Sequence, residues 1–299
     1  MNWLIFTILA CLLYAVVAVF NKFLLGQRAT TKPIVFTFWL GILSIFSFVL
    51  IPFGLAWPGW PAFGLDLAVG VVYFFAILYF YEALDINEAS RVTSLAGGLT
   101  PIVVLFFSLM LLNESLTILQ LVAFFLLVAG AFLISFKKSR GGFKSSVKGL
   151  WFIILAVILS AIYWVAEKYI FENQGFVTGF LWTRLGFILT AVTILVWPAW
   201  RRKIFYSESQ LTLKISSLFV TSKLFAAFGS LFIHLALLLG SAALVNALGG
   251  LQYVFLLILA IILSKKFPDF LKEEISGGVL AQKIVAVLLI GAGLAILAV

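Results

Sequence analysis

The sequence predicts an all-α, multi-pass membrane protein with ten transmembrane helices, arranged as two inverted repeats of five. First, the 299 residues are 64% hydrophobic and only 10% charged, whereas a soluble domain carries about 25% charged residues. Second, the apolar runs are continuous over about 20 residues, the length that a helix needs to cross a bilayer, and do not alternate as membrane barrel strands do. Third, the apolar runs of the two halves match one another in order.

Ten apolar runs are bounded by turn residues or by charges. The first lacks the basic segment of a signal peptide and pairs with the sixth, so we interpret it as a helix. We expect membrane helices over residues 2–21, 33–52, 66–84, 89–112, 117–136, 148–168, 177–197, 215–239, 241–264 and 282–298.

Short motifs recur at matching places in the two halves. Gly97-Gly98-Leu99 in the fourth run returns as Gly249-Gly250-Leu251 in the ninth, and Ala129-Gly130 in the fifth returns as Ala292-Gly293 in the tenth. Because each half has an odd number of helices, the second half must enter the membrane from the opposite face. The two repeats are therefore predicted to be related by a pseudo-two-fold axis in the membrane plane.

This pairing divides the chain into three parts. We expect a first five-helix repeat over residues 1–136, a basic linker over 137–147 and a second five-helix repeat over 148–299. No soluble domain is expected.

The positive charges predict the orientation. Lys168 is the only basic residue in a loop on one face, and Arg184 and Lys223 lie within runs. By the positive-inside rule the opposite face is cytoplasmic, which places the linker inside and both termini outside. That face collects Lys22, Arg28, Lys32, Arg91, Lys137, Lys138, Arg140, Lys144, Lys148, Arg201, Arg202, Lys203, Lys214, Lys265, Lys266, Lys272 and Lys283.

Composition excludes several kinds of site. The net charge of +9 comes from these loops and not from a stripe of basic and aromatic residues, which argues against nucleic-acid binding. The single cysteine, Cys11, excludes an internal disulfide and a cysteine-rich metal site, and the single histidine excludes a histidine-cluster zinc site. We therefore expect no metal and no cofactor.

Several loose motifs are spread over the whole chain: Lys22 and Lys168, Arg184, Tyr81 to Leu84, Ala89-Ser90, Pro101, and Leu112-Asn113-Glu114. In this order and spacing they resemble the ten-helix EamA-like branch of the drug/metabolite transporter superfamily. The sequence departs from that pattern at Trp39, Tyr253 and Lys266. The resemblance implies transport of a small metabolite, often export, along a path lined by helices 1, 3, 4, 6, 8 and 9. It also implies that both termini are cytoplasmic, which disagrees with the charge pattern.

The Gly-Gly pairs are candidates for the path. Pro101 has no amide hydrogen, so in a helix it frees a carbonyl near Gly97. Gly97 and Gly98 then leave backbone groups open to a solute, and Gln252 lies beside the second pair. Alternatively, the Gly-Gly pairs only permit close helix packing.

Ionisable residues within membrane runs are costly and tend to face the protein interior. His234 can contact substrate or carry a proton, or it can simply bond to a neighbouring helix. Arg184 can bind a carboxylate or phosphate, or it can pair with Glu167 or Glu172 as a structural lock. We favour the lock, because the seventh helix is expected at the periphery. Glu82 is the candidate for proton coupling, the alternative being a solvated turn.

Tyrosine and tryptophan near the ends of spans usually form the belt at the membrane interface. Tyr14, Tyr163 and Asn246 are too central for that belt and suit a pocket for an uncharged or zwitterionic organic solute. The polar-tipped residues of the expected path helices are Tyr14, Tyr73, Tyr79, Tyr163, Trp164, Asn246 and Tyr253.

The predicted function is secondary transport of a small organic metabolite, an amino acid or amphipathic solute, by alternating access in an inner (plasma) membrane of prokaryotic type. The chain has no nucleotide-binding glycine-lysine loop. The partners expected are a small-molecule substrate and the lipid bilayer, with a monomer favoured over a homodimer. The alternatives are a channel or a membrane scaffold, for which no selectivity filter is visible, and an intramembrane enzyme, for which Cys11 and His234 make a poor pair.

Overall fold

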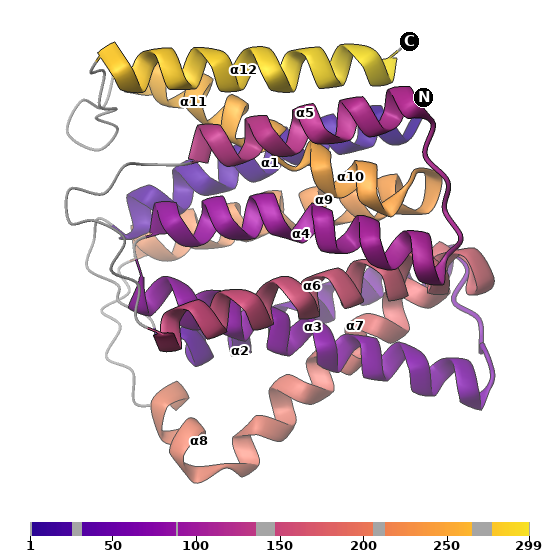
Figure 1. The fold of residues 1–299 in the computed structure, drawn as a ribbon. Helices are drawn as coiled ribbons and strands as arrows, with labels where there is room; N and C mark the ends of the chain where they lie inside the picture. The colour runs from indigo at the N-terminus through magenta and orange to yellow at the C-terminus, as the bar shows by residue number, and fades with distance from the viewer. Residues whose placement is uncertain are drawn as a thin grey trace. The chain divides into compact units, whose positions relative to one another are not determined.

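The computed structural model describes residues 2–25, 32–87, 89–135, 147–205, 213–264 and 277–298, and every regular element in them is a helix (Figure 1). Residues 137–146 of the expected linker lie outside the described residues. The elements are α1 (Asn2–Leu25), α2 (Pro33–Leu43), the 3-10 helix η1 (Ser44–Phe53), α3 (Trp60–Ile86), α4 (Ala89–Leu111), α5 (Ile118–Ser135), α6 (Val147–Gln174), α7 (Phe176–Thr193), the 3-10 helix η2 (Ile194–Val196), α8 (Pro198–Phe205), α9 (Leu213–Leu239), α10 (Ala242–Leu248), α11 (Leu251–Ser264) and α12 (Gly277–Ala298).

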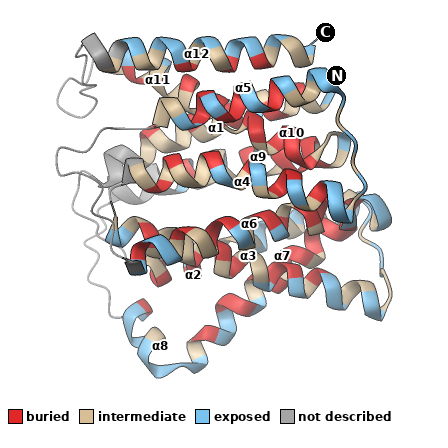
Figure 2. Cartoon of the chain, viewed as in Figure 1, coloured by how far each residue is buried: buried red, intermediate tan, exposed pale blue. Residues whose placement is uncertain are grey.

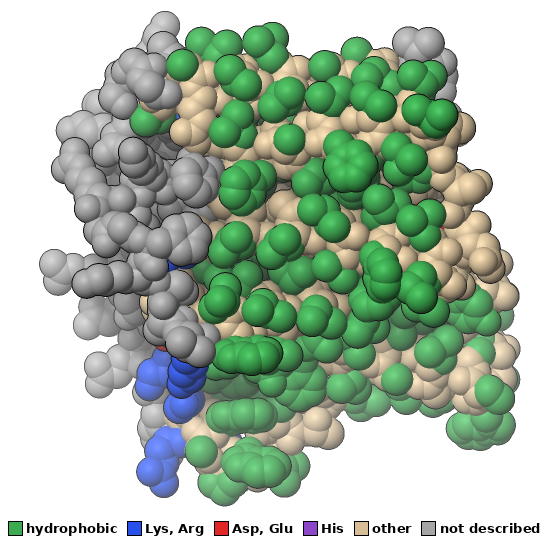
Figure 3. All heavy atoms as spheres, viewed as in Figure 1, with side chains coloured by type: hydrophobic (Ala, Val, Ile, Leu, Met, Phe, Trp, Pro, Cys, Tyr) green, Lys and Arg blue, Asp and Glu red, His purple; other side chains and the backbone are tan. Residues whose placement is uncertain are grey.

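Ten helical segments of the described chain are long and apolar enough to cross a membrane, at the ten expected places. Large apolar side chains cover their outer sides; Phe46, for example, is 71% exposed. Figure 3 shows hydrophobic side chains along the visible helices, with Lys and Arg at the end where α8 lies. Such an exposed apolar surface is stable only against lipid. The protein is therefore an integral, multi-pass membrane protein.

Three details differ from the expected helices. The second span begins as α2 but continues as the 3-10 helix η1, and the ninth consists of α10 and α11 with a break between them. A short helix, α8, follows the seventh span and was not expected from the sequence.

The helices form two compact units, each built from both halves of the sequence. Unit 1 contains Met1–Thr30, Ser115–Lys137 and Ser209–Val299. Unit 2 contains Thr31–Glu114 and Lys138–Glu208. Each of the repeats expected from the sequence thus contributes helices to both units.

Helix contacts within the units follow the pairing of the two halves. In unit 1, α1 packs along α9 and α11. In unit 2, α6 packs along α3 and α4. In the pairing of the two halves, α1 corresponds to α6, α9 corresponds to α3, and α11 corresponds to α4. Each contact named for unit 1 therefore has its counterpart in unit 2. An inverted duplication produces this correspondence.

In unit 1, α5 packs against α12, its equivalent helix in the other half of the chain, and the contact is the same seen from either helix. A Cβ atom on Gly130 of α5 would lie 2.6 Å from the Ile290 side chain of α12. A Cβ atom on Gly293 of α12 would lie 2.8 Å from the Leu127 side chain of α5. Leu127 and Ile290 each precede the glycine of their own helix at the same spacing. The matching Ala-Gly pairs thus allow two equivalent helices to approach closely.

Gly249-Gly250 interrupts the ninth span, whereas α4 continues through Gly97-Gly98. At the break the hydrogen bonds are of the shorter 3-10 type: the Gly249 amide donates to the Asn246 carbonyl at 3.0 Å, and the Tyr253 amide donates to the Gly250 carbonyl at 3.1 Å. A Cβ atom on Gly250 would collide with Ala131 of α5. The break therefore lies at a close contact with α5.

Replacing Gly250 by alanine should destabilise unit 1 by about 1–3 kcal/mol, because the added methyl group forces α5 away. Gly291→Ala in α12 is the matched control, since nothing lies within 4 Å of a Cβ atom there, and alanine favours a helix by up to about 1 kcal/mol. The measurement is the midpoint of thermal unfolding in a mild detergent. Equal midpoints for the two variants would contradict the close packing of Gly250.

Candidate functional site

Arg184 of α7 is a buried cation in unit 2, with 4% of its surface exposed. Its guanidinium carbon lies 4.9 Å from the centre of the Tyr73 ring and 4.7 Å from the centre of the Phe180 ring. A cation over an aromatic face is attracted to the ring, most strongly when water is excluded. These two rings therefore replace part of the hydration that the guanidinium loses.

The rings around Arg184 continue from α3 to α6. Tyr73 of α3 stacks on Tyr163 of α6 with ring centres 4.1 Å apart, and it also contacts Phe187 at 4.8 Å. The buried Glu167 interacts electrostatically with Arg184. We call Tyr73, Tyr163, Glu167, Phe180, Arg184 and Phe187 the Arg184 cluster.

Glu167 and Glu172, the two acidic partners considered for Arg184, have different partners in the structure. Glu172 forms an ion pair with Lys168, one helical turn earlier, at 3.1 Å. Glu167 is the acidic residue that acts on Arg184. The expectation that the seventh helix is peripheral does not hold within unit 2. Figure 2 shows many buried residues along α7. In the apolar 18-residue window of its span 56% of the residues are buried, the largest share for the ten spans.

Asp66 is a buried acidic residue that the sequence interpretation missed. It is fully buried in α3, and its Oδ1 accepts a hydrogen bond of 2.9 Å from Nε2 of Gln174 in α6. Among the described residues, neither Oδ2 of Asp66, Oε1 of Gln174 nor Oγ1 of Thr183 has a hydrogen-bond partner. The expected third helix began at residue 66, which made Asp66 a boundary residue, but α3 begins at Trp60 and places it inside the span.

The other candidates of unit 2 lie in different surroundings. Trp164 contacts its sequence neighbour Tyr163 edge to face, with ring centres 5.3 Å apart. Tyr79 stacks instead on Phe152 of α6 at 5.8 Å. Glu82 is half-buried farther along α3.

The Gly-Gly candidates of unit 2 lie in the middle of α4. Gly97 is half-buried, while Gly98 and Pro101 are buried. The helix is regular through all three, so the missing amide of Pro101 does not break it.

His234 of α9 is 2% exposed in unit 1. Its Nδ1 is hydrogen-bonded to the backbone carbonyl of Ser230 in the preceding turn. Because a carbonyl oxygen only accepts, Nδ1 is the donor in this bond.

Tyr14, Asn246 and Gln252 also lie in unit 1. The Tyr14 ring of α1 packs on α9, where a Cβ atom on Gly229 would be 3.0 Å from it. Asn246 donates from Nδ2 to the Ala242 carbonyl of its own helix at 3.0 Å. Gln252 is half-buried in the first turn of α11, directly after the break.

Residues 1–136 match the sequence profile of the EamA-like transporter family. This half of the chain is an EamA-like transporter domain.

Solved structures extend the likeness beyond the EamA-like domain. Twenty-eight chains of solved structures match significantly. One of them, described as the crystal structure of a protein, aligns over 98% of this chain and 95% of its own length, with a TM-score of 0.68 and 16% sequence identity. At that identity the comparison shows a shared fold alone. We found no significant match among curated proteins.

The EamA-like domain belongs to a family of transporters and not of enzymes, within the drug/metabolite transporter superfamily. The fold of that family is two inverted five-helix repeats. The ten spans and the exchangeable helix contacts of this chain agree with it.

Proposed function

We propose that the protein is a secondary transporter that moves a small organic solute by alternating access between its two inverted repeats. The observation that carries the proposal is the exchangeable contact pattern, in which α1 with α9 and α11 corresponds to α6 with α3 and α4. When two halves are equivalent, exchanging their conformations yields a second state of similar energy that opens to the other face. The EamA-like domain supports the same conclusion.

The side chains favour an amino acid or another amphipathic solute, moved outward. A buried guanidinium suits a carboxylate, and stacked tyrosine and tryptophan rings suit an apolar body. We propose that Glu82, Pro101 and Arg184 act in coupling or gating and that the substrate contacts come from Tyr14, Tyr79, Gly97, Gly98, Tyr163, Trp164, His234, Asn246 and Gln252. One chain suffices for this mechanism, because the two repeats are already fused.

The test is transport by the purified full-length chain in proteoliposomes. Labelled amino acids, nucleosides, sugars and amphipathic cations are offered with and without an imposed proton or sodium gradient. We expect saturable, gradient-dependent flux of at least one class above that of protein-free vesicles. Flux indistinguishable from those vesicles for every class would contradict the proposal, and conductance far above carrier turnover in a planar bilayer would favour a channel.

Tyr163→Phe should lower that flux about tenfold, since losing a buried hydroxyl that interacts with its neighbours costs about 1–3 kcal/mol. Tyr169→Phe is the matched control on the same helix, because Tyr169 is 48% exposed whereas Tyr163 is 1% exposed. Initial rates are compared at equal amounts of folded protein. Equal rates for the two variants would remove Tyr163 from the proposed site.

A further inference from the structure

The short helix α8 docks on unit 2 through one side and exposes positive charge on the other. Ile204 is 5% exposed and packs in a core cluster with Ile34 and Phe38 of α2. Phe205 extends this contact, with its ring centre 6.4 Å from that of Phe38. Arg201, Arg202 and Lys203 are exposed. The buried isoleucine therefore fixes α8 against α2 and holds its basic residues in place.

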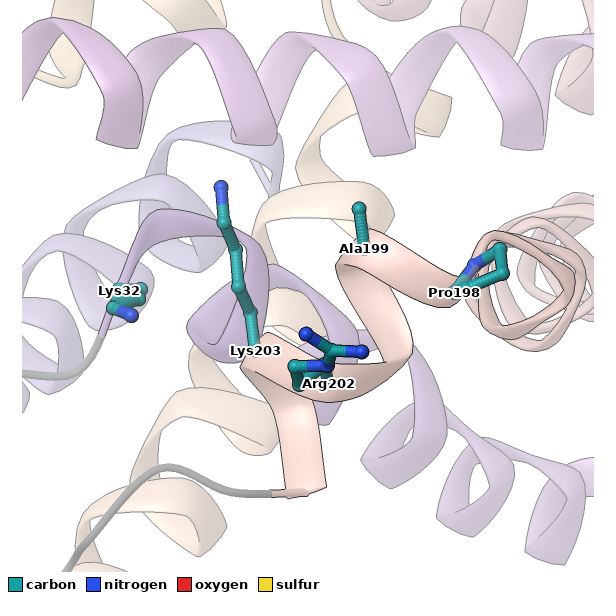
Figure 4. Close-up of a pocket in the computed structure, with 5 residues that line it drawn as sticks. All are labelled: Lys32, Pro198, Ala199, Arg202 and Lys203. Atoms are coloured by element: carbon teal, nitrogen blue, oxygen red, sulfur yellow. The ribbon is translucent and has the colours of Figure 1, made fainter.

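A pocket of about 530 Å³ lies between the beginning of α2 and α8 (Figure 4). Lys32 stands at the start of α2, and Pro198, Ala199, Arg202 and Lys203 come from α8. Three of these five residues are cations and none is acidic. No ion pair joins the three cations to an acidic side chain of the described residues. Among the described residues, the pocket thus combines a volume of about 530 Å³ with three cations and no acidic partner.

The ends of the membrane spans place this pocket at the edge of the apolar layer. Lys32 directly precedes the second span, which starts at Pro33, and α8 begins just after the seventh span, which ends at Val196. Trp197 is 66% exposed, and its ring centre lies 6.1 Å from that of Trp200. Tryptophan gathers at the level of lipid headgroups. The pocket therefore opens at the depth where lipid phosphates lie.

We propose that this pocket binds the phosphate of an anionic phospholipid headgroup. Arg202 offers a planar fork of donors that fits phosphate, and Lys32 and Lys203 add two further positive charges to the lining. A zwitterionic headgroup also carries a cation, which no acidic side chain lining the pocket would balance. The site therefore selects lipids with net negative charge.

Exposed apolar side chains at the two ends of the α8 segment favour a lipid over a soluble phosphate. Val196 is 79% exposed and Phe205 is 60% exposed, at the two ends of the segment that carries the pocket. A lipid can bury its acyl chains against them while its phosphate occupies the cationic pocket. A free phosphate would leave both exposed.

The test uses the full-length protein in a nonionic detergent. Its thermal unfolding midpoint is followed while dioctanoyl phosphatidylglycerol, dioctanoyl phosphatidylcholine or inorganic phosphate is added, because a ligand that binds only the folded state raises that midpoint. We expect phosphatidylglycerol to raise it saturably and phosphatidylcholine and inorganic phosphate to have no saturable effect at equal concentration. The effect should weaken at high salt.

Variants separate the pocket from general surface charge. Lys32→Gln, Arg202→Gln and Lys203→Gln should each weaken phosphatidylglycerol binding about fivefold, since one cation near an anionic lipid surface contributes about a factor of five. Arg201→Gln is the matched control, because Arg201 is an exposed cation of the same helix that does not line the pocket. It should bind phosphatidylglycerol as the unmodified protein does.

Three results would overturn the proposal. Equal stabilisation by phosphatidylcholine would show that the acyl chains alone bind. Saturable stabilisation by inorganic phosphate at the same concentration, lost in Arg202→Gln, would identify a site for a soluble phosphate compound. An equal loss in Arg201→Gln and Arg202→Gln would show a diffuse effect of surface charge. None of these outcomes depends on the transport assay.

Discussion

Replacing Arg184 by methionine should destabilise the folded protein by about 3–5 kcal/mol, the usual effect of removing one partner from buried interacting charges. Methionine fills much of the volume but leaves Glu167 buried without the cation that acts on it. It also removes the charge that lies over the Tyr73 and Phe180 rings. The measurement is the thermal unfolding midpoint in mild detergent, with the yield of monodisperse protein as a second readout.

A double-mutant cycle tests the physical reason. Glu167→Gln added to Arg184→Met removes the second charge, so the double variant should be more stable than Arg184→Met alone. Arg201→Met is the matched control, because Arg201 is exposed on α8 and should change stability by less than about 0.5 kcal/mol. If the double variant shows the summed losses of the two single variants, Glu167 and Arg184 do not interact.

Gly70→Val should destabilise unit 2 by about 3 kcal/mol or more, at the upper end of the cost of overpacking. A Cβ atom on Gly70 of α3 would collide with the backbone of α7, which includes the Thr183 carbonyl and the Phe187 amide. Gly186 of α7 meets the Leu67 backbone in the same way. Backbone cannot turn aside as a side chain can, so α3 and α7 would have to separate.

Gly64→Val is the control on the same helix, since nothing lies within 4 Å of a Cβ atom there. Both variants introduce the same β-branched residue into α3, so their helix propensities change alike. The difference between their unfolding midpoints then measures the packing of α3 on α7. A difference near zero would mean that the two helices do not touch at Gly70.

The glycine pairs show how far the motifs alone could lead. Because Gly97-Gly98 and Gly249-Gly250 repeat, the sequence predicted corresponding places in the two halves. It did not predict that α4 would stay regular while the ninth span would break into α10 and α11. The break lies where Gly250 meets Ala131 of α5, a contact between segments far apart in the chain.

The candidate site was predicted in part. Arg184 and Tyr163 were chosen as polar residues within apolar runs, and the structure brings both into contact with Tyr73. Tyr73 was also among the polar-tipped residues considered for the path, whereas Phe180 was not, because a phenylalanine in an apolar run has no distinct signal. Asp66 was missed because the third helix was expected to start at residue 66, whereas α3 already begins at Trp60.

The sequence by itself determined that the chain crosses a membrane ten times and that its halves are duplicated. Both properties follow from local facts, since hydropathy and helix length act within one segment and a repeat is visible in the order of motifs. Only the tertiary structure decided which helices share a compact unit, which glycines allow close approach, and that Lys32 joins Arg202 and Lys203 around one pocket. These depend on contacts between distant segments, which packing selects and local sequence does not encode.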